Sequence, residues 1–178
     1  MTGIPKTLMP RSAAPGPGAP QEPTAAGGAG KDPSAGRNLL FLREAELRLA
    51  QDLLFFGYRD FTAGADAILA GLGMGRAHHR VLHFVGRRPG ITVGELLGIL
   101  GITKQSLGRV LTPLIDDGYV TQAPGRSDRR QRLLSLTPKG SALERSLFDR
   151  QRETVMQAYR EAGPPAVEGF RRVMRGLM

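Results

Sequence analysis

Apolar positions recur at helical spacing in several stretches, and the clearest pattern begins at Val93. The apolar positions 93, 96, 97 and 100 predict a helix of about eight residues. Thr92 and Glu95 have the spacing of a capping box, in which each side chain satisfies the backbone N–H of the other residue. Gly101 follows at the place where a left-handed C-terminal cap is needed. We therefore expect a short helix between Thr92 and Gly101.

A second helix is predicted directly after the first. Thr103 is a good N-cap, and an apolar stripe follows it at Leu107, Val110, Leu111, Leu114 and Ile115. Two helices joined by so short a turn containing glycine match the helix-turn-helix pattern. Pro113 removes one helical hydrogen bond, so we expect it to kink or shorten this helix. Asp116 and Asp117 lie at the C-terminal end, where negative charge opposes the helix dipole.

The other face of the second helix is polar and carries Lys104, Gln105, Gly108, Arg109 and Thr112. Lysine, glutamine and arginine side chains reach base edges and phosphates in a major groove. Taken alone, these residues have an alternative interpretation as an ordinary solvated face.

Two predicted strands with a basic turn between them come next. The pattern predicts strands over Tyr119–Ala123 and Arg132–Leu136, joined by a loop rich in turn residues. The arginines at positions 126, 129, 130 and 132 are accompanied by a single acid, Asp128. Such a charge density repels itself unless an anion is nearby. We expect Asp128 to pair with a neighbouring arginine and shape the tip. An arginine-rich surface turn without a ligand is the alternative, but two basic elements in this order favour a winged helix-turn-helix that holds duplex DNA.

The run from Ile102 to Thr137 resembles the MarR family of bacterial and archaeal transcriptional regulators, with D-x-R at positions 128–130 and L-S-L-T at 134–137. The resemblance covers about residues 39–177. It implies a homodimer whose terminal helices form the interface, with the second helix of each motif in a major groove and Arg130 in a minor groove. Pro113 and the long Pro/Gly tail depart from the family pattern.

The resemblance also implies the residues that contact DNA. The groove-facing set of the second helix is Lys104, Gln105, Ser106 and Arg109, and Arg130 is the minor-groove residue of the wing. The charge of the loop adds Arg126, Arg129 and Arg132 to the expected DNA-binding residues of the wing, with Asp128 shaping the tip. A small anionic or aromatic effector, bound between the dimer helices and the winged unit, is a further implied partner. No residue identifies that effector.

The chain is expected to have four segments: a disordered tail over 1–37, an N-terminal dimerisation helix over 38–75, the winged unit over 76–138 and C-terminal dimerisation helices over 139–178. The tail holds seven of the 13 prolines and too few apolar side chains to offset its ordering entropy. Residues 39–56 are rich in Leu and Phe on more than one face, which indicates burial on several sides. A partner subunit would supply that cover; the alternative is a core helix of a monomer. Pro164 is expected to break the last helical stretch. The fold class is therefore mainly α with a small β-hairpin wing.

Three histidines lie in the predicted helix over 76–88. His79 and His83 share a face, but the chain has no cysteine and that helix has no acid to complete a metal site. A polar lining for an effector pocket is therefore favoured over a metal site, and His78 has no assigned role. The absence of cysteine also excludes disulfides and a thiol switch.

Charge supports a polyanion partner. Residues 76–138 carry ten Lys and Arg against four Asp and Glu, or +6 of the total net charge of +9, as a DNA-binding surface requires. We expect a homodimeric, sequence-specific DNA-binding regulator in the cytoplasm, with no cofactor, no membrane span and no enzymatic activity, since no nucleophile–base pair or phosphate-binding glycine loop is present. The alternative is an architectural or protein-interaction module without effector control.

Overall fold

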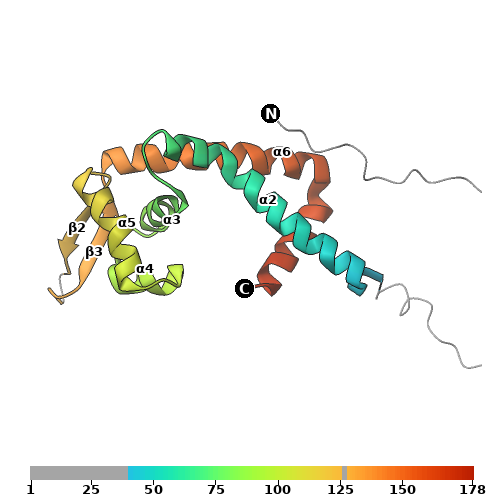
Figure 1. Ribbon diagram of the computed structural model, residues 1–178, viewed down its shortest axis with the longest axis horizontal. Helices are drawn as coiled ribbons and strands as arrows, with labels where there is room; N and C mark the ends of the chain where they lie inside the picture. The colour runs from blue at the N-terminus through green and yellow to red at the C-terminus, as the bar shows by residue number, and fades with distance from the viewer. Residues whose placement is uncertain (1–39, 126–127) are drawn as a thin grey trace, which may run out of the picture. The chain divides into compact units, whose positions relative to one another are not determined.

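The computed structural model describes residues 40–125 and 128–178, and the predicted tail lies outside them. The chain divides into a first unit, Met1–Arg43, and a second unit, Glu44–Met178. The described part of the first unit is one 3-10 turn, η1 (Leu40–Leu42). The second unit contains α2 (Glu44–Ala70), α3 (Arg76–Arg87), β1 (Ile91–Thr92), α4 (Val93–Leu100), α5 (Lys104–Asp116), β2 (Val120–Pro124), β3 (Arg132–Leu136) and α6 (Pro138–Gly176) (Figure 1). The order from α3 to β3 is that of a winged helix-turn-helix, which confirms the predicted fold class.

The wing belongs to a three-stranded antiparallel sheet with the strand order β1–β3–β2. β3 has the predicted bounds, while β2 is shifted by one residue, to Val120–Pro124. The third strand, β1, is a feature that the sequence pattern misses, because two residues cannot show the alternation that identifies a strand. Ile91 of β1 pairs with Leu134 of β3. The start of α4 is thereby tied to the wing.

The caps confirm the predicted start and end of α4. The Thr92 hydroxyl accepts from the Glu95 N–H at 3.1 Å, and the Glu95 carboxylate accepts from the Thr92 N–H at 2.8 Å. The backbone hydrogen bond from Thr92, followed by its hydroxyl, lowers the pKa of the Glu95 carboxyl. Gly101 adopts a φ of 62° at the other end. After it, the Thr103 hydroxyl accepts from the Ser106 N–H and begins α5.

Pro113 does not shorten α5, contrary to the sequence expectation. The helix continues to Asp116, and Leu114 is fully buried one residue after the proline. Pro113 and Arg109 both lie on the exposed side, so water can reach the carbonyl that lost its donor. Burial of the inner face therefore outweighs one missing hydrogen bond. Gly118, with a φ of 71°, ends the helix instead.

The start of α6 is fastened to the end of α5 and to the base of the wing. The Thr137 hydroxyl donates to the Gly118 carbonyl at 2.7 Å, and the Thr137 N–H donates to the Tyr119 carbonyl at 3.0 Å. Lys139 donates to the Asp117 carbonyl at 2.7 Å and lies over the Tyr119 ring. This cation offsets the unfavourable acids at the C-terminal end of α5.

The core is centred on α3, which contacts α2, α4, α5, α6 and β3. Its fully buried leucines come from each of these layers: Leu69, Leu82, Leu96, Leu107, Leu114, Leu134 and Leu147. Burying one such side chain contributes about 2 kcal/mol. One continuous core therefore holds both the second helix of the motif and the wing.

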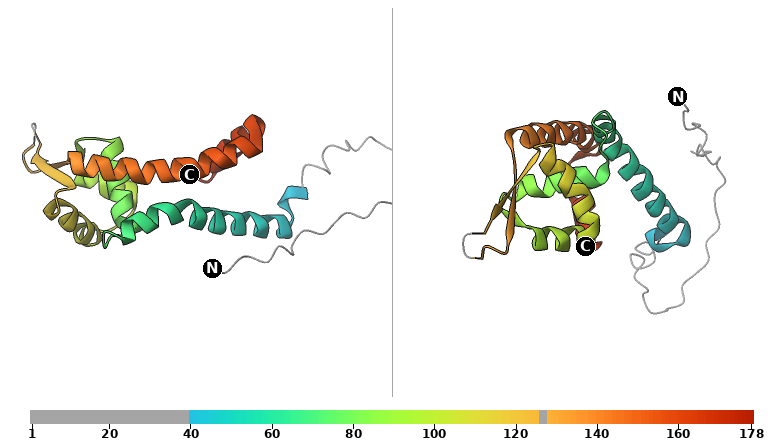
Figure 2. Two further views of the ribbon diagram at one scale, coloured as in Figure 1. Left: turned by 90° about the horizontal axis from the view of Figure 1, so that it is seen from above. Right: turned by 60° about the vertical axis from the view of Figure 1, so that its left-hand side comes forward.

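α6 is interrupted where the sequence predicts a break. Gly163 has non-helical angles, with φ 76° and ψ 166°, directly before Pro164. The residue before a proline is driven out of the helical region, and glycine takes up the positive φ without strain. The helix before the break packs against α2, where Gly64 lies beside Arg150 (Figure 2).

The first half of α2 lacks cover within the described residues. The helix starts at Glu44, later than expected, with two acids in its first turn that suit the positive end of a helix dipole. Residues 44–60 are all exposed, and Phe55 is 74% exposed. The other exposed large apolar side chains of α2 and of the end of α6 include Leu47, Leu49, Leu53, Leu54, Phe56, Phe170, Val173 and Leu177. No helix among the described residues is long and apolar enough to cross a membrane.

We expect Gly140→Ala to destabilise the protein by about 2 kcal/mol, the scale of an overpacked core position. A Cβ at Gly140 would lie far inside van der Waals contact with the Tyr119 carbonyl, so the start of α6 must move away from the wing. The measurement is urea unfolding followed by circular dichroism. Gly98→Ala is the matched control, because its added methyl meets nothing within 4 Å and should raise stability by about 0.5–1 kcal/mol. Equal stability of the wild type and Gly140→Ala would contradict the close packing of α6 on Tyr119.

Candidate nucleic-acid interface

A groove of about 530 Å³ lies between α5, the start of α4 and the wing. Its apolar floor comes from the inner side of α5, at Leu107, Leu111 and Ile115. Its polar walls contain three cations, Lys104, Arg130 and Arg132, and no Asp or Glu. Because like charges gathered beside a low-dielectric floor strengthen one another's field, the groove attracts an extended anion.

The four residues predicted on the second helix do not form one cluster. Lys104 lines the groove on the wing side. Ser106 and Arg109 line a separate cavity of about 280 Å³ on the α3 side. Gln105 is exposed and lines neither. Since successive residues of a helix point 100° apart, α5 divides the set between two flanks and an outer edge.

Ser106 is engaged in the cap of α5. Its hydroxyl oxygen accepts from the Thr103 hydroxyl at 3.0 Å, while its backbone N–H donates to the same Thr103 oxygen at 3.2 Å. The hydroxyl retains one proton to donate. Gln105 and Arg109, which the structure leaves exposed, have more freedom to reach a partner.

The predicted wing residues are also divided by the structure. Arg130 and Arg132 line the groove, whereas Arg129 is exposed outside it. Arg126 lies outside the described residues. The three described arginines of the wing therefore differ in position, and two of them stand opposite Lys104 across the groove.

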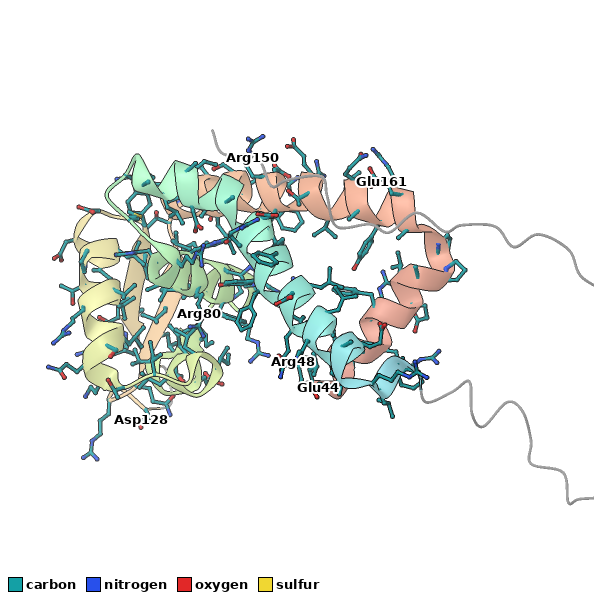
Figure 3. The ribbon with its side chains drawn as sticks, turned by 45° about the vertical axis from the view of Figure 1, so that its right-hand side comes forward. Glu44, Arg48, Arg80, Asp128, Arg150 and Glu161 are labelled. Atoms are coloured by element: carbon teal, nitrogen blue, oxygen red, sulfur yellow. The ribbon has the colours of Figure 1, made fainter. Side chains whose placement is uncertain are left out.

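Asp128 bonds to the backbone of the wing. Its Oδ1 accepts from the Arg130 N–H at 2.9 Å, and its carbonyl accepts from the Gln131 N–H at 3.1 Å. No salt bridge joins it to the described arginines of the wing. Arg126 lies outside the described residues, so the expected ion pair stays a prediction. A short acidic side chain commonly folds back on its own turn in this way. Asp128 is labelled in Figure 3, and Arg129, Arg130 and Arg132 are exposed.

Thr112, which the sequence places on the polar face of the second helix, lines the groove. Three other neutral polar residues of the groove are ones that the sequence reasoning misses: Thr92, Gln122 and Gln131. The signal for Gln122 is strand alternation, because Gln122 shares a face with the buried Val120 and lies just past the core on that face. For Thr92 the sequence shows only its role as the N-cap of α4. Its place at the groove depends on β1 pairing with β3.

A third cavity, of about 290 Å³, contains the histidines that have no role in the groove. It is lined by aromatic and basic side chains from α2 and α3 and by Gln151 of α6: Tyr58, Phe61, Arg76, His79, Arg80, His83 and Phe84. Burial lowers the pKa of both His79 and His83; the neighbouring His83 adds to this effect at His79, and Glu144 opposes it at His83. Burial therefore favours the neutral form of both rings.

His78 has a different position from the other two histidines. Its Nδ1 accepts from the Gly75 N–H at 3.1 Å and caps α3. No group of three potential metal ligands occurs among the residues the structure describes.

Comparison with known proteins places these features in a family. The sequence model of the MarR family matches residues 72–131. The HTH-type transcriptional regulator PetP of Rhodobacter capsulatus is 53% identical over 143 residues, which cover 80% of this chain and 86% of that protein.

Solved structures share the fold at lower identity. A mutant of Escherichia coli MarR complexed with operator DNA has a TM-score of 0.60 and 21% identity, covering 78% of this chain and 98% of that one. Streptococcus pneumoniae FabT in complex with DNA has a TM-score of 0.63 and 18% identity, covering 74% of this chain and 94% of that one. With PetP more than half identical over most of both chains, the protein belongs to the MarR family of transcriptional regulators.

Proposed function

We propose that this regulator binds duplex DNA sequence-specifically as a homodimer. The observation that carries the proposal is the groove between α5 and the wing, whose walls hold Lys104, Arg130 and Arg132 without any carboxylate. A sugar–phosphate strand is an extended anion of the kind that such a groove attracts. The solved complexes of MarR and FabT with DNA support a nucleic-acid ligand for this fold.

In the proposed complex α5 enters a major groove and the wing reaches the neighbouring minor groove. Gln105 and Arg109 are exposed on α5, and their side chains can pair bidentately with adenine and guanine edges respectively. Lys104, Arg130 and Arg132 neutralise the phosphates between the two grooves. Arg129 and Arg126 add charge from the tip, and Asp128 orients the tip through the Arg130 N–H.

The proposal separates the role of Arg109 from that of Arg130. Arg109→Ala should cost about 1–3 kcal/mol on the operator and relax the preference at one base pair per half-site. Arg130→Ala should weaken binding to many sequences and make the salt dependence shallower by about one unit. The measurement is affinity for the operator, obtained by selection from random DNA, and for a scrambled duplex at several salt concentrations.

Arg150→Ala serves as the matched control, because it removes an arginine from α6, where Arg150 pairs with Glu153. It should leave both affinities nearly unchanged. Equal losses on operator and scrambled DNA for Arg109→Ala would reduce Arg109 to a phosphate contact. A selection that yields no preferred sequence would favour the alternative, an architectural or protein-interaction module.

The homodimer part of the proposal rests on the uncovered apolar side chains of α2 and of the end of α6. Leu53 is 64% exposed, Phe55 74% and Val173 63%, and residues 44–60 have no buried member. Monomeric proteins seldom expose a contiguous apolar surface spread over two helices. A second copy of the chain is the proposed cover, which makes residues 38–75 and 139–178 the dimerisation segments.

Sedimentation equilibrium at micromolar concentration should therefore give twice the chain mass of 19.2 kDa. Leu53→Glu should shift the protein toward the monomer, because it would bury a charge in the interface. Gln51→Glu introduces the same charge at a polar position of the same helix and should stay dimeric. A monomeric wild type that still binds its operator would refute this architecture.

Control by a small anionic or aromatic effector is supported by the cavity that contains His79 and His83. Arg80 supplies positive charge there, beside Arg76, which is paired with Asp66 at 2.8 Å. Tyr58, Phe61 and Phe84 supply aromatic surface. A small aromatic carboxylate combines the two properties that this lining matches.

Benzoate is therefore expected to raise the unfolding temperature in a concentration-dependent way, as measured by differential scanning calorimetry. Benzamide has nearly the same shape without the charge, and it should have a much smaller effect. Equal responses to the two compounds, or no response to either, would speak against an anion-binding cavity.

A further inference from the structure

Arg80 of α3 does not line the groove between α5 and the wing, but it forms a hydrogen bond close to the start of α5. Its Nη2 donates to the Leu100 carbonyl at 3.0 Å, and Leu100 is the last residue of α4. Carbonyls at a helix C-terminus have no partner inside the helix, and a cation at that end also favours the helix dipole. Arg80, labelled in Figure 3, thus joins α3 to the end of α4.

The bonded carbonyl directly precedes the turn into α5. Gly101 and Ile102 form that turn, and Thr103 caps α5. Gly101 holds a φ of 62° and has no side chain to pack, so only the partly buried Ile102 fastens the turn to the core through a side chain. A bond to Leu100 therefore restrains the point from which α5 starts.

Packing restrains the start of α5 weakly on this side. The cavity of about 280 Å³ lies between α3 and the first turns of α5 and is lined by Arg80, Ser106 and Arg109 together with apolar residues. Atoms that border a cavity lose the contacts that would hold them in place. Arg80 borders this space and reaches the end of α4, so its hydrogen bond supplies a restraint that side-chain packing does not.

We propose that Arg80 is a positioning residue for sequence recognition: by holding the Leu100 carbonyl, it sets the placement of α5 and hence of Gln105 and Arg109 on the bases. The inference rests on the proposed DNA-binding function. Arg80 itself touches no base in this scheme. Its loss therefore reduces discrimination between sequences more than it reduces general affinity for DNA.

The test compares full-length wild type, Arg80→Met, Arg80→Lys and the control Arg87→Gln, which removes a cation two turns along the same helix. Affinities are measured for the operator and for a scrambled duplex of equal length, at several salt concentrations. Arg80→Met should lose about tenfold on the operator, the scale of one hydrogen bond from a charged donor. Its affinity for the scrambled duplex and its salt dependence should match those of Arg87→Gln. Arg80→Lys can still donate to the carbonyl and should recover most of the operator affinity.

Three outcomes of the binding measurements would overturn the proposal. Equal losses on both duplexes, with a salt dependence about one unit shallower, would make Arg80 a phosphate contact. Unchanged operator affinity in Arg80→Met would leave the hydrogen bond without a role in recognition. Failure of Arg80→Lys to recover operator affinity would mean that donation to Leu100 is not what matters.

Amide hydrogen exchange of the free protein supplies a second measurement that needs no DNA. The amide N–H groups of Gly101 and Leu107 donate to the carbonyls of Leu97 and Thr103. In Arg80→Met, which loses the hydrogen bond to Leu100, these two amides should exchange about tenfold faster. The Ser141 amide, which donates to Thr137 at the start of α6, should not change. Uniform acceleration would indicate a general loss of stability and overturn the positioning role. If the wild type binds the operator and the scrambled duplex equally well, the proposed sequence-specific function fails. The amide exchange rates would still decide whether Arg80 restrains the turn between α4 and α5.

Discussion

The surface proposed to bind DNA, formed by α5 and the wing, depends on the contact between the start of α6 and the turn that follows α5. Thr137 bonds to the carbonyls of Gly118 and Tyr119, Lys139 bonds to the carbonyl of Asp117, and Gly140 leaves no room for a side chain against Tyr119. These bonds satisfy backbone groups that a helix end and a strand start would otherwise leave unpaired. Because α5, the wing and α6 meet at this one place, their relative positions are set together.

The groove between α5 and the wing follows from that arrangement. Leu107 and Leu134 lie in one core and hold the helix beside the hairpin, so Lys104 of the helix and Arg130 and Arg132 of the wing border one space. All three cations are exposed, and Lys104 is far in sequence from Arg130 and Arg132, yet together they create a field that none would have alone. The energy of folding is supplied by the apolar core, and the charges are free to serve binding.

The helices outside the winged unit, α2 and the end of α6, carry apolar side chains that need cover from outside the described chain. Their apolar side chains exceed what the described chain can cover, and Phe55 and Val173 remain largely exposed. The proposed dimer would bury this surface, and the two winged units would then be presented together. Arg80 borders both the pocket that α3 shares with α2 and the pocket that α3 shares with α5. A shift of α2 would therefore act beside the residue that is proposed to restrain α5.

The sequence by itself determined the local elements of this protein. Capping at Thr92 and Thr103, the glycines at 101 and 118, and the break beside Pro164 are short-range effects, so neighbouring residues suffice to predict them. Long-range contacts decided the rest. Burial of Leu114 allows α5 to continue past Pro113, the pairing of Ile91 with Leu134 adds a strand of only two residues, and Asp128 bonds to the backbone of its own turn. Tertiary structure also decided which side of α5 each predicted DNA-binding residue faces: Lys104, Gln105, Ser106 and Arg109 are divided among two flanks and an outer edge. The elements that pack beside α5 come from distant parts of the chain, so the sequence of the helix alone does not show them.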